Sequence, residues 1–355
     1  MRRERLTLRS YRGHKTMRSL KHHSGHQETS ARRSLRGLEL RCPPLPQTLL
    51  EVLELMNQPE KMEVGPVSEM VQRDPIVVAR LLHIVNSAYY GLRHTIGSAD
   101  RAVVMLGPLA VAGIVLGMHM LKLRTILDGP AGACFHRLIR HSIATAFLTR
   151  HLVEGTPRES TQKSSSARIG LPFTAGLLHD FGKIILVYNY QKDAVGLYDE
   201  NAFDKQVAAV DDRELEQLLF GCDHTEAGEF AARKLHFPDV LVSVIRHHHN
   251  PFGTAESPEA DRLIRAAAAA NLVAKAMGYA FSRAEKVDDL IHHPIWNLLI
   301  ETGPSRHATP EAAIEDLLQQ QEDLDQYVKH LTSSAFDSID DDELRRSAEI
   351  WKMRP

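Results

Sequence analysis

Cysteine and strand-like patterns are scarce in this sequence. Their scarcity excludes a fold held by disulfide bonds and a fold built from β-strands. Only three of the 355 residues are cysteine, namely Cys42, Cys134 and Cys222. An odd number at unrelated spacings is not a disulfide framework and favours a reducing compartment, so we predict a cytoplasmic protein. Alternating apolar and polar residues bounded by turns are not evident. Helical periodicity recurs throughout, and we therefore predict an all-α fold.

A membrane span is the first alternative to exclude. Residues 102–121 contain no formal charge and are flanked by Arg101 and Lys122. This length is about that of a bilayer-spanning helix. Gly107-Pro108 lies in the middle, however, and proline fits the first turn of a new helix better than a helix interior. We predict two buried core helices that meet here, and no transmembrane segment.

The first forty residues differ in charge from the rest of the chain. They hold eleven Lys and Arg against three Glu, a net charge of +8, whereas the other 315 residues hold 32 basic and 42 acidic side chains, a net charge of −10. Such a segment can contact nucleic acid or an anionic surface, or imitate a transit peptide. A disordered extension, or a start codon read too early with Met17 as a later one, explains the same residues. We predict a basic, disordered tail over residues 1–40.

Several helix ends and one insertion are also marked in the sequence. Asp74 before a proline predicts the start of a helix that continues through Tyr89, with Leu81, Leu82 and Val85 packed inside and Asn86 holding a turn or a neighbouring backbone group. Ser98 is expected to cap the next helix, and Thr309 a polar helix that continues to about Leu331. The Ser-rich and Gly-rich stretch over residues 154–170 predicts a flexible insertion.

The most informative segment is Gly176-Leu-Leu-His179-Asp180-Phe-Gly182-Lys183. Its apolar residues follow helical spacing: Phe173, Leu177, Phe181, Ile184 and Ile185. This spacing predicts one amphipathic helix after Pro172 and up to Tyr188, with His179, Asp180 and Lys183 away from the apolar stripe. Adjacent imidazole and carboxylate groups can bind one ion or two neighbouring ions, and they suit Mn, Fe, Zn or Ni better than Ca. A solvated polar face is the alternative interpretation.

Further histidines accompany this pair. His141 is predicted near the start of a helical stretch, His224 follows the pair, and His248 and His249 end the apolar run over residues 240–245. A lone histidine is more often a hydrogen-bonded structural group than a ligand. Histidines spread in this way, however, let several helices converge on one point, as in helix-bundle metal sites. Cys222, close to His224, is either a soft ligand or an ordinary buried thiol.

Several motifs together resemble one known family. They are Leu45-Pro46, Gln72-Arg73-Asp74-Pro75, Ala79-Arg80-Leu81-Leu82, Val85-Asn86-Ser87-Ala88-Tyr89-Tyr90-Gly91, Ala102-Val103-Val104-Met105-Leu106-Gly107, and residues 177–183, 221–226 and 245–251. From Leu40 to Gly278 the chain resembles the HD-related output domain (HDOD) family of the HD superfamily, a bacterial signalling module similar to the HD-GYP phosphodiesterases. The Asn-Ser-Ala-Tyr-Tyr-Gly segment points to the output-domain branch.

The resemblance implies a set of site residues. The family's metal positions fall on His141, His179, Asp180, His224, His248 and His249, and the closing aspartate of active enzymes falls on Asn271. Asparagine is a neutral oxygen donor, so the site loses a negative charge that would help to hold a dication. The sequence also has no Gly-Tyr-Pro tripeptide and no Glu in the turn before His141. The ligand set is therefore largely kept, and the catalytic apparatus is incomplete.

These observations predict a two-lobed helical bundle with an HD-like helical domain. We expect a tail over residues 1–40, an HDOD domain over 41–279 with lobes at 41–123 and 131–279, and a C-terminal helical appendage over 280–355.

The main functional hypothesis is a bacterial signal-transduction regulator that acts on a signalling protein partner and keeps a partial site for Fe, Mn, Zn or Ni. The alternative is a metal-dependent phosphohydrolase acting on nucleotides or cyclic dinucleotides, with Lys183 steadying a phosphate oxygen. A third hypothesis is a nucleic-acid-binding regulator that uses its basic tail. No small-molecule substrate is assigned.

Overall fold

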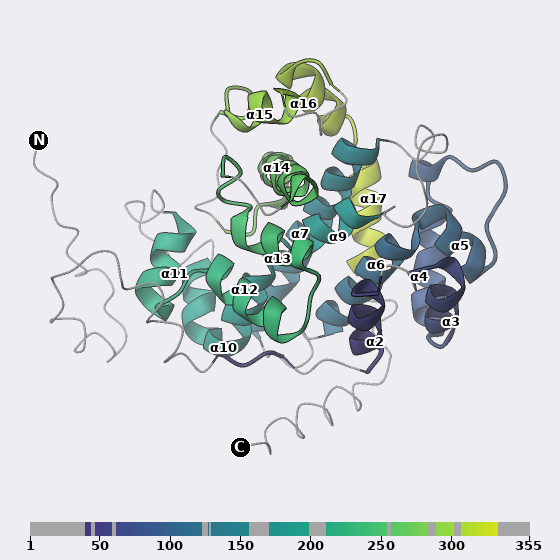
Figure 1. The fold of residues 1–355 in the computed structure, drawn as a ribbon, viewed down its shortest axis with the longest axis horizontal. Coiled ribbons are helices and arrows are strands. Elements are labelled where there is room, and N and C mark those ends of the chain that lie inside the picture. The colour runs from purple at the N-terminus through teal and green to yellow at the C-terminus, as the bar shows by residue number, and fades with distance from the viewer. Residues whose placement is uncertain are drawn as a thin grey trace, which may run out of the picture. The chain divides into compact units, whose positions relative to one another are not determined.

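A computed structural model describes residues 40–43, 47–58, 62–122, 127, 129–155, 170–198, 211–253, 257–282, 289–301 and 307–332 (Figure 1). Every regular element among these residues is a helix, which confirms the predicted all-α class. Residues 1–39 of the predicted tail and 156–169 of the predicted insertion lie outside the described residues. The described residues, which begin at Leu40, belong to one compact unit.

The N-terminal helices begin and end close to the predicted positions. They are α2 (Gln47–Met56), α3 (Val64–Gln72), α4 (Pro75–Val85), the 3₁₀ turn η4 (Ala88–Tyr90), α5 (Ala99–Leu106) and α6 (Pro108–Lys122). Asp74 caps α4 by accepting hydrogen bonds from the backbone of Ile76 and Val77, and Ser98 caps α5. The helix predicted through Tyr89 ends earlier, at Val85.

Asn86 explains that early end. Its Nδ2 donates to the carbonyl oxygens of Leu82, at 2.8 Å, and Ile96, at 2.9 Å, and its Oδ1 accepts from the backbone N–H of Ile96 at 2.8 Å. The side chain therefore holds the segment before α5 against the end of α4, which confirms the expected role of Asn86. Leu81 and Val85 are buried as predicted, whereas Leu82 is only half-buried.

The uncharged stretch forms two helices, as predicted. The axes of α5 and α6 differ by 106°, and Gly107 has a φ of +86° at the bend. In the described part of the chain, no single helix is long and apolar enough to cross a membrane, although this bent pair passes a test of length and composition. Residues 108–120 of α6 are all buried, and His119 among them bonds to the carbonyl of Val115.

The candidate ligands lie on and between six helices that include the long helix α7 (Figure 1). These helices are α7 (Pro130–Glu154), α9 (Leu171–Leu178), α10 (Phe181–Tyr198), α12 (His224–Lys234), α13 (Asp239–His247) and α14 (Pro258–Ala274), which continues into the π-helical turn η7 (Lys275–Tyr279). α7 packs along α9 and α14, and α12 packs between α10 and α13. His141 lies in the middle of α7, so the expectation that a helix starts there was wrong.

The remaining helices are α11 (Asp212–Phe220), α15 (Ile295–Glu301), α16 (Pro310–Leu318) and α17 (Gln321–Thr332). Thr309 caps α16 as predicted. The single polar helix expected up to Leu331 is instead two helices, separated at Gln319 and Gln320. α17 packs against both α7 and α4. It therefore joins the helix of His141 to the N-terminal helices.

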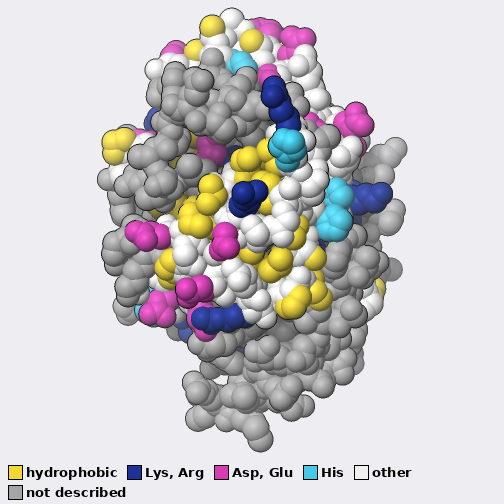
Figure 2. Space-filling model, turned by 90° about the vertical axis from the view of Figure 1, so that its right-hand side faces the viewer, with side chains coloured by type: hydrophobic (Ala, Val, Ile, Leu, Met, Phe, Trp, Pro, Cys, Tyr) yellow, Lys and Arg dark blue, Asp and Glu magenta, His cyan; other side chains and the backbone are white. Residues whose placement is uncertain are grey.

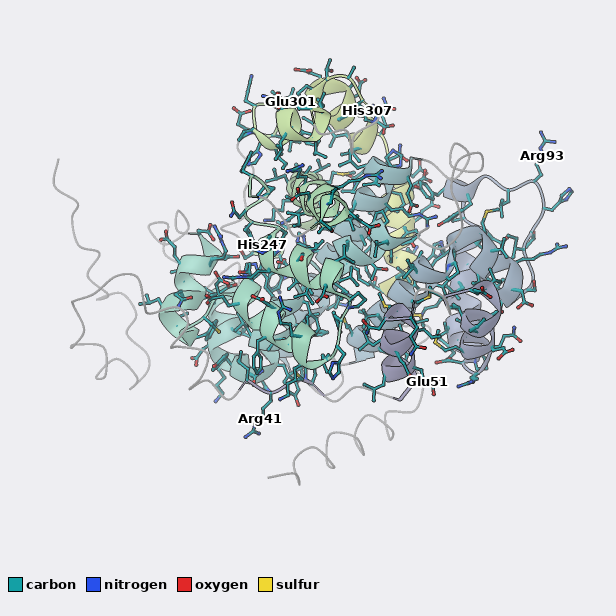
Figure 3. The ribbon with its side chains drawn as sticks, in the orientation of Figure 1. Arg41, Glu51, Arg93, His247, Glu301 and His307 are labelled. Carbon is teal, nitrogen blue, oxygen red and sulfur yellow. The ribbon has the colours of Figure 1, made fainter. Side chains whose placement is uncertain are left out.

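Hydrophobic side chains gather on one face of the molecule, with acidic, basic and histidine side chains among and around them (Figure 2). That view looks onto the side where Figure 1 draws α3, α4 and α5. α5 contains Val104, whose exposed fraction of 63% is the highest among the large hydrophobic residues described as exposed. Arg93 projects from the loop before α5 (Figure 3). The N-terminal helices thus leave apolar surface uncovered.

Candidate metal centre

The turn between α9 and α10 places His179 and Asp180 in the interior. The predicted amphipathic helix over this segment was wrong, because α9 ends at Leu178 and α10 begins at Phe181. All residues of α9 are buried, so its polar side faces other helices and not solvent. A helix enclosed on every side has no solvated face from which its orientation can be predicted.

Two glycines let the surrounding helices approach this turn. A Cβ at Gly182 would overlap the carbonyl oxygen of His224 and lie 2.7 Å from the backbone nitrogen of Gly228. α10 and α12 therefore cross in backbone contact, and this crossing brings the first residue of α12, His224, to the site. At Gly176 a Cβ would lie 2.8 Å from the carbonyl oxygen of Thr145, one turn beyond His141 on α7. Gly182 and Gly176 therefore permit α12 and α7 to approach the turn that carries His179 and Asp180.

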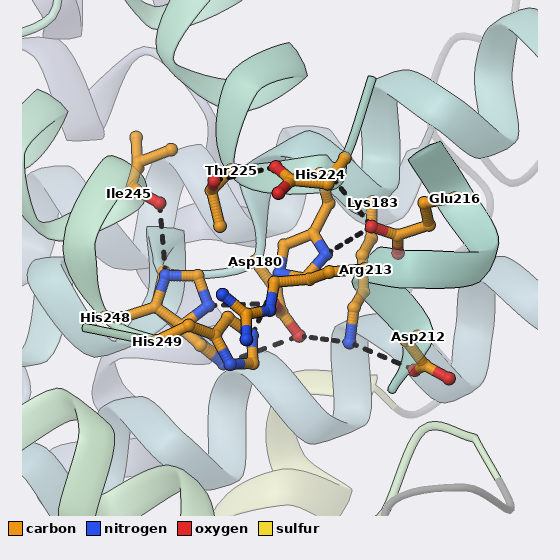
Figure 4. Close-up of polar contacts among 12 residues, drawn as sticks. Asp180, Lys183, Asp212, Arg213, Glu216, His224, Thr225, Ile245, His248 and His249 are labelled. Atoms are coloured by element: carbon orange, nitrogen blue, oxygen red, sulfur yellow. Dashed lines mark hydrogen bonds and ion pairs between the residues drawn. The ribbon is translucent and has the colours of Figure 1, made fainter. Parts of the chain in front are cut away.

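Six of the predicted site residues come together around the Asp180 carboxylate. Figure 4 labels four of them, namely Asp180, His224, His248 and His249. Two groups of potential ligand atoms each lie within 4.8 Å of one another. Group 1 is His141, His179 and Asp180, and group 2 is Asp180, His224, His248 and His249. Asp180 belongs to both groups, so one carboxylate could serve two neighbouring ions.

The two oxygens of Asp180 face different groups. Oδ2 lies 3.5 Å from the Nε2 atoms of His141 and His179. Oδ1 lies 3.4 Å from the Nε2 atoms of His224 and His248. In each case the nitrogen that faces the carboxylate is Nε2, so the rings share one orientation relative to the centre.

Hydrogen bonds on the far side of each ring explain this orientation. Nδ1 bonds to a backbone carbonyl in three histidines: to Tyr279 from His141 at 2.8 Å, to Gly176 from His179 at 2.7 Å, and to Ile245 from His248 at 3.1 Å. A carbonyl only accepts, so Nδ1 is the protonated nitrogen and Nε2 of a neutral ring keeps its lone pair. Ligand histidines are held in the same way in metal sites.

The centre contains buried acceptors that no described protein group satisfies. Oδ1 of Asp180, Nε2 of His248 and Oδ1 of Asn271 are buried without a hydrogen-bond partner among the described residues, whereas Oδ2 of Asp180 lies 3.1 Å from the Lys183 ammonium. Moreover, Nε2 of His141 lies 3.3 Å from that of His179. Two lone pairs at this distance repel unless a proton or a cation lies between them. Unsatisfied buried acceptors are costly, and a transition-metal ion that prefers imidazole and carboxylate ligands would satisfy them. The residues therefore fit such an ion.

Protonation states also suit metal binding. Burial lowers the pKa of His179 well below its ordinary value, and it also lowers the pKa of His248 and His249. Burial alone would raise the pKa of Asp180, but the Lys183 ammonium beside it and the neighbouring imidazoles hold that pKa well below its usual range. Neutral imidazoles and an ionised carboxylate are the forms that bind a metal.

Lys183, the predicted catalytic residue, lies inside this centre. Its side chain is 1% exposed, and Nζ lies 3.1 Å from Oδ2 of Asp180 and 3.9 Å from Oδ2 of Asp212. Nζ also lies 5.3 Å from the centre of the Phe281 ring. The ammonium thus faces two carboxylates of the protein itself.

Three further residues lie outside the two groups. Asn271 is buried on α14, the helix that packs against α7 and α13. Cys222 is buried and belongs to neither group, and burial raises its pKa to about 12. His247 is exposed, unlike its neighbour His248, and its position on α13 is labelled in Figure 3.

The sequence interpretation missed Glu216, Tyr198 and Asp212. Glu216 accepts hydrogen bonds from both His224 and Tyr198. Asp212 and Glu216 lie four residues apart, so they share the face of α11 that also buries Phe220. The sequence did contain a signal for two of them: Asp212 and Glu216 are spaced at one helical turn in line with Phe220, which predicts that they are buried with it.

The fold and the centre define a helical domain of the HD type. The HDOD domain family matches residues 42–251, more than half of the chain, and the chain belongs to this family.

Structural relatives agree on the fold. An HDOD domain protein of unknown function from Geobacter sulfurreducens has a TM-score of 0.61 and 20% identity, over 85% of this chain and 97% of its own. A proposed signal transduction protein from Marinobacter aquaeolei VT8 has a TM-score of 0.60 and 20% identity, over 86% and 66% of the chains. A proposed metal-dependent phosphohydrolase from Shewanella amazonensis SB2B has a TM-score of 0.53 and 16% identity, over 81% and 93%.

An uncharacterized protein from Treponema pallidum (strain Nichols) is 22% identical over 208 residues. The match covers 59% of this chain and 37% of that protein, so this chain spans little more than a third of its relative.

Proposed function

We propose that this chain is a metal-binding regulatory protein that passes a signalling state to a protein partner, and that it is not a working phosphohydrolase. The observation that carries the proposal is the burial of a nearly complete ligand set. The side chains of His141, His179, Asp180, His224 and His248 are at most 2% exposed. An ion at this depth can stabilise one packing of several helices, whereas a substrate needs an open coordination position.

Three further features support a regulatory role. Lys183 faces Asp180 and Asp212, so its charge is already used within the protein. Asn271 stands where the resemblance places the closing aspartate of active enzymes, and it supplies no charge for a second ion. The exposed apolar surface of the N-terminal helices, with Val104 at 63% exposure, is of the kind that protein partners cover.

A metal-dependent phosphohydrolase remains the second candidate. Asp180 takes part in both ligand groups, and a carboxylate shared by two ions is suited to hydrolysis of phosphate esters. In that role the ions would supply an activated water, His179 and Asp180 would hold them, and Lys183 would have to turn from the carboxylates toward a phosphate oxygen.

Metal analysis tests the metal-binding part of the proposal. The purified chain is reconstituted with Mn, Fe, Zn or Ni under reducing conditions and its metal content is measured. We expect stoichiometric metal in the wild type and in His247→Ala, the exposed matched control. We expect loss of metal at group 2 in His248→Ala, and loss of all metal in the double variant His179→Ala, Asp180→Ala, which removes ligands of both groups. A metal-free wild type after reconstitution would remove the metal from the proposal.

A hydrolysis assay separates the two candidates. Wild type, Asp180→Ala and Asn271→Asp are compared with added Mn or Fe on nucleotides, cyclic dinucleotides and a generic phosphoester. We expect no turnover of cyclic dinucleotides by the wild type, and at most slow hydrolysis of the other substrates. Rapid hydrolysis by the wild type that Asp180→Ala eliminates would establish the enzyme instead.

A further inference from the structure

Helix α11 presents two buried acidic residues to the metal centre. Asp212 and Glu216 are buried, while Glu214 and Gln217 on the same helix are exposed. A buried carboxylate is expensive unless it is paired or hydrogen-bonded. Both carboxylates therefore need partners, and both find them in or beside the centre (Figure 4).

Glu216 makes three short hydrogen bonds. Its Oε2 accepts from the backbone nitrogen of His224 at 2.7 Å and from Nδ1 of the same residue at 2.6 Å, and its Oε1 accepts from the Tyr198 hydroxyl at 2.6 Å. His224 is the first residue of α12, where backbone N–H groups lack partners within the helix. One carboxylate therefore fixes both the ring and the backbone of this ligand, and Tyr198 fixes the carboxylate.

This support differs from that of the other ligands. His141, His179 and His248 donate from Nδ1 to neutral backbone carbonyls, whereas His224 donates to a carboxylate. A hydrogen bond to a charged acceptor is roughly twice as strong as a neutral one, and a carboxylate partner makes imidazole a more basic ligand. His224 belongs to group 2 only.

Asp212, one turn before Glu216 on the same face of α11, contacts a second residue of the centre. Its Oδ2 accepts from the Ser282 hydroxyl at 2.8 Å and lies 3.9 Å from Nζ of Lys183, whose nearer partner is Asp180. α11 thus places negative charge beside both the lysine and the histidine that flank Asp180. The docking of one short helix and the geometry of group 2 are therefore linked.

We infer that Glu216, held by Tyr198, is a positioning residue for group 2: it keeps Nε2 of His224 directed at Asp180, and metal binding at group 2 but not at group 1 depends on it. The inference rests on the metal binding proposed above. The inference goes further because it assigns a role to α11, a helix that supplies no ligand. It also distinguishes the two groups, since only metal binding at group 2 should depend on α11.

The test compares four variants with the wild type. Glu216→Ala removes the acceptor, Glu216→Gln keeps an oxygen but removes the charge, Tyr198→Phe removes only the hydroxyl, and Glu214→Gln changes an exposed glutamate of the same helix. Metal affinity is measured by competitive titration with Co²⁺, whose visible spectrum reports the ligands. The tautomer of each histidine in the metal-free protein is measured by ¹H–¹⁵N NMR.

We expect Glu216→Ala to weaken one binding step by about 10- to 100-fold and to leave the other step unchanged. Glu216→Gln should lose less, Tyr198→Phe should weaken the same step by a few-fold, and Glu214→Gln should match the wild type. In the metal-free protein, the Nδ1-protonated tautomer of His224 should stop being the preferred one in Glu216→Ala, and it should stay preferred in the other variants.

Wild-type affinity at both steps in Glu216→Gln and Tyr198→Phe would overturn the inference, and these two variants decide the matter if Glu216→Ala does not fold. Equal weakening of both steps would overturn it as well. A wild type that binds no metal refutes the proposed metal function, whereas the histidine tautomers still test the role of Glu216.

Discussion

The N-terminal helices and the helices around the metal centre bury their residues in different ways. In α4, apolar residues such as Leu81 and Val85 face inward, and the polar cap Asp74 lies at the helix end. In α9 all residues are buried, and the turn that follows puts His179 and Asp180 into the interior. The spacing of apolar residues therefore predicts which face of α4 is buried, but it does not predict how α9 is oriented. The spacing carries this information only where one face of a helix meets solvent.

Glycine also plays different parts in the two regions. No atom lies within 4 Å of a Cβ built at Gly65 or Gly97 in the N-terminal region. At Gly176 and Gly182 the same Cβ would overlap the backbone of a neighbouring helix. The centre thus depends on helices in backbone contact, and we expect it to be the region less tolerant of added volume.

Gly182→Ala should lower the free energy of unfolding more than any other change considered below. The new Cβ would overlap the His224 carbonyl, and because backbone cannot rotate away like a side chain, the cost should exceed the roughly 1 to 3 kcal/mol of ordinary overpacking. We expect no cooperative unfolding transition by circular dichroism. The matched control is Gly65→Ala, in the first turn of α3, where no atom lies within 4 Å of the new Cβ and the free energy of unfolding should change by less than about 0.5 kcal/mol. Wild-type unfolding of Gly182→Ala would mean that α10 and α12 are not in contact.

Leu81→Ala should rank second, since it tests apolar packing without touching the centre. Leu81 is fully buried, so its truncation should lower the free energy of unfolding by about 2 to 5 kcal/mol. The half-buried neighbour Leu82 should lose clearly less on the same change. The free energy of unfolding is measured by urea denaturation. Equal losses in Leu81→Ala and Leu82→Ala would show that α4 is rotated about its axis, so that both side chains are buried alike.

Acidification should destabilise the metal-free protein through the centre. The pKa values of His179, His248 and His249 lie below the ordinary value of about 6.5. Below that pH the unfolded chain binds protons that the folded chain does not, so stability is lost as pH falls from about 7 to 5. The pKa of His224 is raised, chiefly because Glu216 outweighs the effect of burial, and its stabilising contribution below about 6.5 opposes part of this loss.

Urea denaturation in the presence of a chelator, at pH 7, 6 and 5, measures this effect. The penalty of Leu81→Ala should be the same at each pH, because that residue belongs to the apolar region. Stability that rises between pH 7 and 5 would show that these histidines are charged in the folded protein.

Val104→Ala should have the smallest effect. Its side chain is 63% exposed, so the free energy of unfolding should change by less than about 0.5 kcal/mol. The adjacent Val103 is fully buried, and Val103→Ala should cost clearly more. A large loss at Val104 in thermal unfolding would mean that the exposed face of α5 is covered by another part of the chain.

The sequence by itself determined the helix boundaries that depend on local chemistry. The caps Asp74, Ser98 and Thr309 and the bend at Gly107-Pro108 act within one helical turn, so they can be identified without knowledge of the fold. The family motifs also indicated which histidines would gather, since the predicted ligands of groups 1 and 2 do lie together.

Only the tertiary structure decided how that gathering is achieved. The break between α9 and α10, the position of His141 in mid-helix and the support of His224 by Glu216 depend on which helices enclose one another. Contacts of this kind join residues far apart in the chain, such as His141 and Tyr279, which are 138 positions apart. No local propensity encodes them, because their free energy is gained only when the chain has packed.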